Sequence, residues 1–251
     1  MAARDRPAPR PSDGAFADAR GAVMLEFLLA FVPVFVLFLG LLQLVLLGVA
    51  DLVVRHAAIT GVRAAVVVLY DDPAYYRGSA QGDARDLQRG ESRIEAIHTA
   101  VQAPLAALAP RGAAAGSLPP GRTEFARAAT AITFPSAPGA TELLEDLAQA
   151  ETITVRVTRL VPCAVPLAGW LLCKRPHWSA RDKRLAFARE SEPARQALEE
   201  LKHARGAKVQ RRLATGAVPL ALLQAEASMA AQVAPYLYPS ERTESGPHAS
   251  R

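Results

Sequence analysis

The apolar run from Gly21 to Val54 limits what this chain can fold into more than any other feature. No charged residue lies between Phe27 and Ala50. About 24 helical residues at roughly 1.5 Å each extend about 36 Å, which is enough to cross a hydrocarbon core of roughly 30 Å. The run therefore predicts a transmembrane helix over 22–50, and the 251-residue chain leaves room for one further domain of ordinary size.

A single carboxylate, Glu26, stands at the head of this run. It would cost on the order of 2.5 to 3.5 kcal/mol if it reached the centre of the bilayer. One interpretation is that Glu26 lies at the membrane interface and reaches the polar side. The other follows from its context, RGAVMLEF over 20–27, in which a small residue, four spacers, a glutamate and an aromatic open a long apolar helix.

This context resembles the class III signal of type IV pilins, in which a prepilin peptidase cuts after the glycine. Together with the downstream layout, the chain is similar to the TadE/TadG-like minor pilins, or pseudopilins, of tight-adherence (Flp-type) pilus systems, most clearly over residues 20–69. The resemblance implies cleavage between Gly21 and Ala22 and an assembly role for Glu26 and Phe27. In such proteins the glutamate is thought to pair with the freed amino terminus of a neighbouring subunit, which would remove much of its burial penalty.

The same resemblance implies a set of partners. They are other pilin or pseudopilin subunits, the prepilin peptidase, inner-membrane platform proteins and the lipid bilayer. Initiating minor pilin, assembly factor and secretion-system pseudopilin all remain open as roles.

The residues around the span predict its orientation. Residues 1–21 are polar and contain proline, so we expect a disordered cytoplasmic leader. Arginines on this side of a first span favour its retention in the cytoplasm. We therefore expect a single-pass protein of the bacterial inner membrane, with an extracytoplasmic pilin-like domain over 51–239 and a disordered tail over 240–251.

Helical spacing continues beyond the span. From Asp51 to Tyr70 apolar residues recur at helical intervals, and Asp51 and Arg55 are placed to form an i, i+4 ion pair. This predicts one long helix, half in lipid and half packed on the domain, that ends near Pro73. A second helix is predicted to begin at Ser92, where SRIE has the spacing of a capping box. The apolar residues that define the expected buried stripe of the long helix are Leu52, Ile59, Val62, Val66 and Leu69.

Strand patterns follow in the second half of the chain. Residues 130–134 alternate larger side chains with small ones, and residues 152–158 alternate polar and apolar positions, which predicts strands with one face toward the core and one toward water. Helices are expected over 141–150, over much of 181–212 and over 218–229. The predicted fold class is α+β: a long amino-terminal transmembrane helix that continues into a soluble pilin-like domain with a small antiparallel sheet and further helices.

Cys163 and Cys173 are the only cysteines. Two cysteines at this spacing do not suit a zinc site, which needs four ligands from a short list. A disulfide is the economical interpretation outside the cytoplasm, and two unpaired buried thiols are the alternative. The apolar run between them, Val165 to Leu172, is too short to span a bilayer and should be core or a patch for a partner subunit.

Evidence for chemistry is absent from the sequence. Phosphate loops, Rossmann glycines, the nucleophile elbow and the common zinc motifs do not occur, and the five histidines are scattered. We therefore expect no catalytic residues, no cofactor and no metal site. The stretch 174–212 carries 12 Lys or Arg against 5 Asp or Glu, which indicates a solvated helical face rather than a nucleic-acid site.

Two other classes of function compete with the structural one. An unprocessed, single-pass interaction module of the cell envelope would not need Glu26. A membrane-anchored enzyme would need acids or histidines clustered in a folded cleft.

Overall fold

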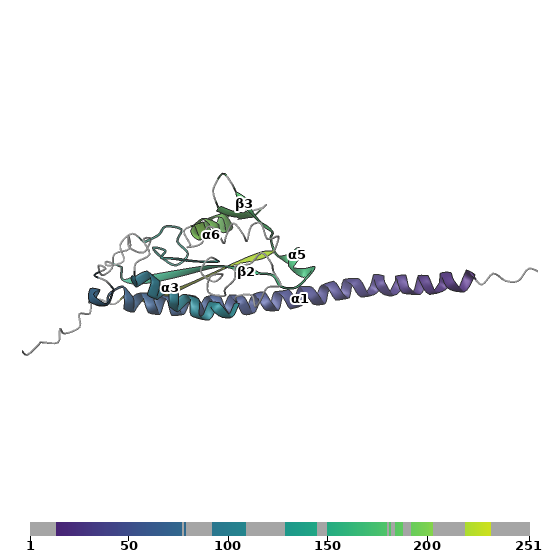
Figure 1. The fold of residues 1–251 in the computed structure, drawn as a ribbon, viewed down its shortest axis with the longest axis horizontal. Coiled ribbons are helices and arrows are strands. Elements are labelled where there is room, and N and C mark those ends of the chain that lie inside the picture. Colours follow the sequence, from purple (N-terminus) through teal and green to yellow (C-terminus); the bar gives the residue numbers. More distant parts are fainter. Residues whose placement is uncertain are drawn as a thin grey trace, which may run out of the picture.

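The structure is a computed structural model and describes residues 14–76, 78, 92–108, 129–144, 150–179, 181, 184–187, 192–202 and 219–231. The fold is α+β. One helix, α1 (Gly14–Val68), runs the length of the molecule, and the domain sits on its second half (Figure 1). The predicted tail and residues 1–13 of the predicted leader lie outside the described residues. The other elements, in chain order, are η1 (Pro73–Tyr76), α3 (Ser92–Leu105), η2 (Ala106–Leu108), β1 (Thr130–Thr133), β2 (Thr152–Pro162), α5 (Ala168–Leu172), β3 (Pro176–Ser179), β4 (Arg184–Phe187), α6 (Glu192–Lys202) and β5 (Leu220–Ala230).

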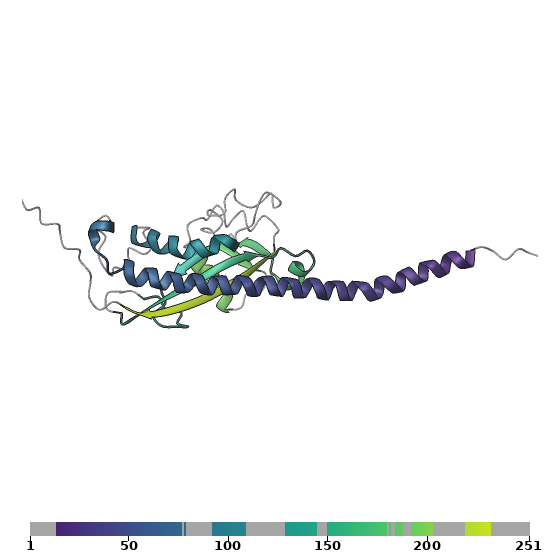
Figure 2. The same ribbon diagram turned by 90° about the horizontal axis from the view of Figure 1, so that it is seen from below.

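The single long helix was predicted, but it starts earlier than expected. Residues 14–20 are helical, where the composition predicted a disordered leader, because alanine-rich sequence extends a helix at little cost. The helix runs unbroken through Pro33, and its first half curves (Figure 2). Asp51 and Arg55 form the predicted ion pair at 2.8 Å.

The buried stripe of α1 differs in part from the predicted one. Val62 and Leu69 are buried as expected, but Leu52 and Ile59 are 66% and 41% exposed. The observed buried stripe is rich in alanine, because small side chains let other elements approach the helix closely. The prediction relied on large apolar residues and therefore missed these alanines. The buried members of the stripe are Val54, Ala57, Ala58, Val62, Ala65, Val68 and Leu69.

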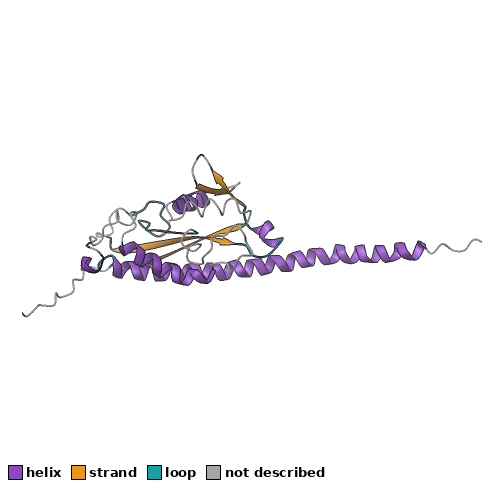
Figure 3. Ribbon diagram, in the orientation of Figure 1, coloured by secondary structure: helices purple, strands orange, loops and turns teal. Residues whose placement is uncertain are grey.

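The main sheet has three antiparallel strands in the order β1-β2-β5, with β2 in the centre. Its strands run beside the second half of α1 (Figure 3). Helices α1 and α3 cover one face, where Ile153, Val155 and Val157 join the main core. Leu160 packs into a second core with Leu198 of α6 and residues of β4. Strands β3 and β4 form a separate two-stranded sheet.

Burial on both faces of β2 corrects the expectation that one face meets water. The side chains of Arg156 and Arg159 are polar, yet the residues are only 4% and 0% exposed. Nη1 of Arg159 donates a 2.6 Å hydrogen bond to the hydroxyl of Thr130 on β1. Burial lowers the pKa of Arg159 to about 10, so the guanidinium remains charged at neutral pH.

Three helix predictions in the second half of the chain were wrong in whole or in part. Residues 220–230 form a strand along the whole of β2, because cross-strand pairing overrides a modest helix preference. Residues 141–144 are not helical, since Leu143 forms an isolated bridge with Pro135, and 145–149 lie outside the described residues. Within 181–212, strand β4 precedes α6, Pro193 lies in the first turn of that helix, and residues 203–212 lie outside the described residues.

A buried arginine on α3 caps the carboxyl-terminal end of α1. Arg93 is 3% exposed, and its guanidinium donates to the carbonyl of Val68 and, at 3.0 Å, to that of Asp71. It also lies 4.4 Å from the centre of the Tyr76 ring. Desolvation lowers the pKa of Arg93, opposed by Tyr76 and the neighbouring aspartates. The charge therefore offsets the negative end of the helix dipole and satisfies carbonyls that the helix leaves unpaired.

Replacing Arg93 with methionine should lower the free energy of unfolding by about 1 to 3 kcal/mol, because buried carbonyls lose their donor while helix propensity is unchanged. Chemical denaturation of the detergent-solubilised chain, followed by circular dichroism, measures this change. Arg195→Met is the matched control: Arg195 also lies in a helix, and its 3.3 Å pair with Glu192 is exposed. Equal effects in the two variants would contradict the capping role.

Candidate membrane and assembly interface

The first half of α1 is an exposed apolar surface. From Ala22 onward the helix is long and apolar enough to cross a membrane, and only 6% of its most apolar window is buried. A core helix of a water-soluble protein would be mostly buried instead. Phe27, Phe31 and Phe35 stack along it with ring centroids 5.5 Å apart at each step. Such a surface needs lipid or other apolar helices to cover it.

The predicted processing and assembly residues all lie at the start of this surface. Gly21 and Ala22 are within continuous helix, one turn before Glu26. The side chains of Ala22, Glu26 and Phe27 are exposed, and Phe27 belongs to the stacked row of rings. The structure thus places Glu26 on the helix surface, where a second chain can reach it.

Two residues of the predicted span, Gln43 and Ala50, are buried, and Gln43 is polar. Gln43 is 1% exposed, and its Oε1 accepts a 3.1 Å hydrogen bond from the backbone N–H of Val165. Gln43 therefore joins the disulfide loop of the same chain to α1.

The disulfide between Cys163 and Cys173 is present, as predicted, with Cα atoms 6.6 Å apart. The alternative of two free thiols was therefore wrong. The loop that this disulfide closes contains α5. In the apolar run of the loop, Val165 and Ala168 are buried, whereas Trp170 and Leu171 are each 63% exposed. The loop is thus partly core and partly an exposed apolar patch.

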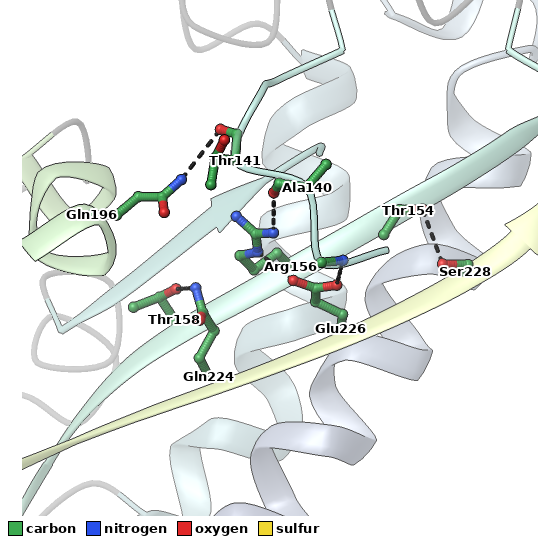
Figure 4. Close-up of polar contacts among 10 residues, drawn as sticks. Ala140, Thr141, Thr154, Arg156, Thr158, Gln196, Gln224, Glu226 and Ser228 are labelled. Atoms are coloured by element: carbon green, nitrogen blue, oxygen red, sulfur yellow. Dashed lines mark hydrogen bonds and ion pairs between the residues drawn. The ribbon is translucent and has the colours of Figure 1, made fainter. Parts of the chain in front are cut away.

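A ladder of polar pairs joins β2 to β5 on the face of the sheet that carries Arg156 (Figure 4). Nε of Arg156 lies 2.5 Å from Oε1 of Glu226. The loop 134–144 closes over this pair, because Gly139 donates its N–H to Glu226 at 2.7 Å and Arg156 donates to the carbonyl of Ala140. The flanking pairs are Thr154 with Ser228 at 2.9 Å and Thr158 with Gln224 at 3.2 Å.

Sequence analysis missed this ladder, although a signal was present. Gln224, Glu226 and Ser228 alternate with Ala225 and Ala227, which is the period of a strand and not of a helix. The ladder joins the two longest strands of the sheet, and its member Gln224 also lines the groove described next.

An open groove of about 380 Å³ lies beside this sheet, between the start of β5, β4 and α6. Its described lining is mostly apolar, and Lys174 is the one charged residue among the described residues that line it. Across the described part of the chain, no group of three His, Cys, Asp or Glu is placed to hold a metal ion. The described lining of the groove contains no acid and no histidine.

The described chain consists of one long helix, exposed along its first half, and a compact α+β head packed on its second half. No protein-family model, no curated protein and no solved structure matches this chain.

Proposed function

We propose that this chain is a structural minor pilin or pseudopilin of a Tad-type pilus or a related secretion apparatus, held in the bacterial inner membrane by the first half of α1. The observation that carries the proposal is the division of one 55-residue helix into an exposed apolar half and a half packed in an α+β head. A subunit of this shape can pass from lipid into a polymer if neighbouring helices replace lipid around the apolar half. The head then stays outside the membrane, as the arginines before the span favour.

The position of Glu26 favours a role of this helix in assembly over a role in anchoring alone. It is exposed at the end of the apolar surface, where a carboxylate gains most from a cation on another chain. Cleavage after Gly21 would create such a cation four residues away in sequence, at the new amino terminus of each subunit. Gly21 also has the lowest helix propensity in its neighbourhood, which favours local opening of α1 at the bond to be cut.

The test is the amino-terminal mass of the chain extracted from membranes, expressed with and without its cognate prepilin peptidase. A chain that starts at Ala22 only when the peptidase is present is the expected result. Gly21→Leu should abolish the shift in mass, because the small residue before the cut is lost. The matched control is Gly40→Leu in the same helix, where an added side chain meets no atom within 4 Å.

An intact start at Met1 or Ala2 in both samples would overturn the proposal. The chain would then be an unprocessed, single-pass interaction module of the envelope. In that case Glu26→Gln should also leave its complexes unchanged.

A further inference from the structure

The disulfide loop lies where the head meets the apolar half of α1 (Figure 1). Its exposed side chains are apolar, whereas a loop at a water-exposed surface is normally polar. Four large apolar side chains face outward from it: Leu167 (56% exposed), Trp170 (63%), Leu171 (63%) and Leu172 (47%). Two properties of the loop indicate what covers this apolar patch: how the loop is held in the fold, and where it lies along α1.

The loop is held rigidly to the rest of the molecule. Its two ends bond to the start of β5, through Cys163 N–H to the carbonyl of Pro219 at 3.0 Å and through Lys174 N–H to the carbonyl of Leu220 at 3.0 Å. Inside it, Gly169 approaches Cys163 so closely that an added Cβ would lie 3.1 Å from the Cβ of that cysteine. The bond from Val165 to Gln43 then fixes the loop to α1.

The backbone conformation of Leu167 indicates that its exposed side chain has a role other than in folding. Its φ is 62°, which a leucine adopts at a cost of order 1 to 3 kcal/mol and a glycine adopts freely. A glycine at this place would relieve the strain and remove an exposed apolar group. Folding alone does not explain a leucine here.

The depth of the loop follows from the spacing of charges on α1. Glu26 and Asp51 bound the uncharged stretch, and Gln43 lies 17 residues, or about 26 Å, beyond Glu26. A hydrocarbon core of roughly 30 Å that begins at Glu26 ends about 20 residues later, near Leu46. A loop docked at Gln43 therefore lies at the outer boundary of the hydrocarbon.

The chemistry of the patch suits that depth. Tryptophan is enriched where hydrocarbon meets headgroups, and basic side chains there reach toward phosphates. The guanidinium of Arg175 lies 5.9 Å from the centre of the Trp170 ring, and Lys174 beside it is exposed. No Asp or Glu occurs from Cys163 to Arg181, so nothing in this stretch repels anionic lipid.

We propose that the loop closed by Cys163 and Cys173 is a second membrane contact, an interfacial foot that inserts Leu167, Trp170 and Leu171 into the outer leaflet. It rests on the anchoring of α1 in the membrane, which the proposed function shares, and not on cleavage or polymerisation. Two contacts fix the rotation of α1 about its own axis, whereas a single helix can turn freely in lipid. The head is thereby presented to other subunits in one orientation.

The test uses the full chain in vesicles of phosphatidylethanolamine and phosphatidylglycerol, with bromine-labelled acyl chains as quenchers of fluorescence. The chain has two tryptophans, so Trp178→Phe leaves Trp170 as the sole reporter and Trp170→Phe leaves Trp178. Bromine near the headgroup end of the acyl chain should quench Trp170 several-fold more strongly than Trp178, which lies in β3 and is the matched control. Leu171→Asp, an exposed substitution that leaves the core intact, should weaken the quenching of Trp170.

Retention of the chain by the vesicles in alkaline carbonate reports separately on α1. A chain that is retained but shows equal quenching of the two tryptophans would overturn the foot and leave the anchor intact. Release of the chain would overturn the anchor and the foot together. A Trp170 that both lipid bromine and aqueous acrylamide fail to quench would assign the patch to another protein subunit and overturn the lipid contact.

Discussion

Replacing Glu226 with alanine is expected to lower the free energy of unfolding by about 2 to 4 kcal/mol, because the change leaves Arg156 buried without its carboxylate. The Arg156 side chain is only 5% exposed, and that of Glu226 is 23% exposed. The carboxylate also accepts the N–H of Gly139, so its loss frees the loop that covers the pair. We expect a fall in Tm of about 4 to 16 °C, since 1 kcal/mol shifts a domain of this size by about 2 to 4 °C.

Thermal denaturation of the full chain in detergent, followed by circular dichroism, measures this effect. Arg55→Ala is the matched control, because it breaks an ion pair of similar length whose arginine is 67% exposed, and such pairs contribute little. The double variant Arg156→Met with Glu226→Ala should recover much of the loss, since no buried charge is then left unpaired. A double variant as unstable as Glu226→Ala alone would show that packing, and not the unpaired charge, causes the loss.

The polar ladder also explains why sequence reasoning misassigned β5. Leucine and alanine dominate 220–230, and both favour helix when local preference decides. Pairing with β2 over eleven residues decides instead, through contacts such as Arg156 with Glu226 that lie 70 residues apart in the chain. Local spacing cannot supply that information, although the alternation around Glu226 agreed with it.

Features that depend on local sequence were predicted well. The continuation of α1 beyond the apolar run, the ion pair of Asp51 with Arg55, the start of α3 at Ser92 and the disulfide all follow from residues near one another in the chain. The roles of Gln43 and Arg93 could not be predicted from nearby residues. Each bonds to backbone that is brought close only by the complete fold, so neither has a local signature.

Replacing Gly61 with leucine is expected to destabilise the head by about 3 kcal/mol. Gly61 lies where α1, α3 and β2 meet, and an added Cβ would stand 2.6 Å from Cγ2 of Val101 and 3.3 Å from Cγ1 of Val155. Both valines are fully buried, so neither can move aside into water. Overpacking of this kind costs about 1 to 3 kcal/mol for small additions, and leucine adds three carbons beyond that Cβ.

Whether Gly61→Leu lowers or raises the free energy of unfolding distinguishes an effect of packing from an effect of helix propensity. Leucine favours helix over glycine by about 0.8 kcal/mol, so without the close approach the substitution would stabilise α1. Gly40→Leu, in the same helix but in open space, should therefore leave the denaturation midpoint unchanged or raise it slightly. Val101→Ala should restore part of the stability when it is combined with Gly61→Leu, because it removes the nearest methyl group. Full stability of Gly61→Leu alone would mean that α1 and α3 are packed more loosely than the structure shows.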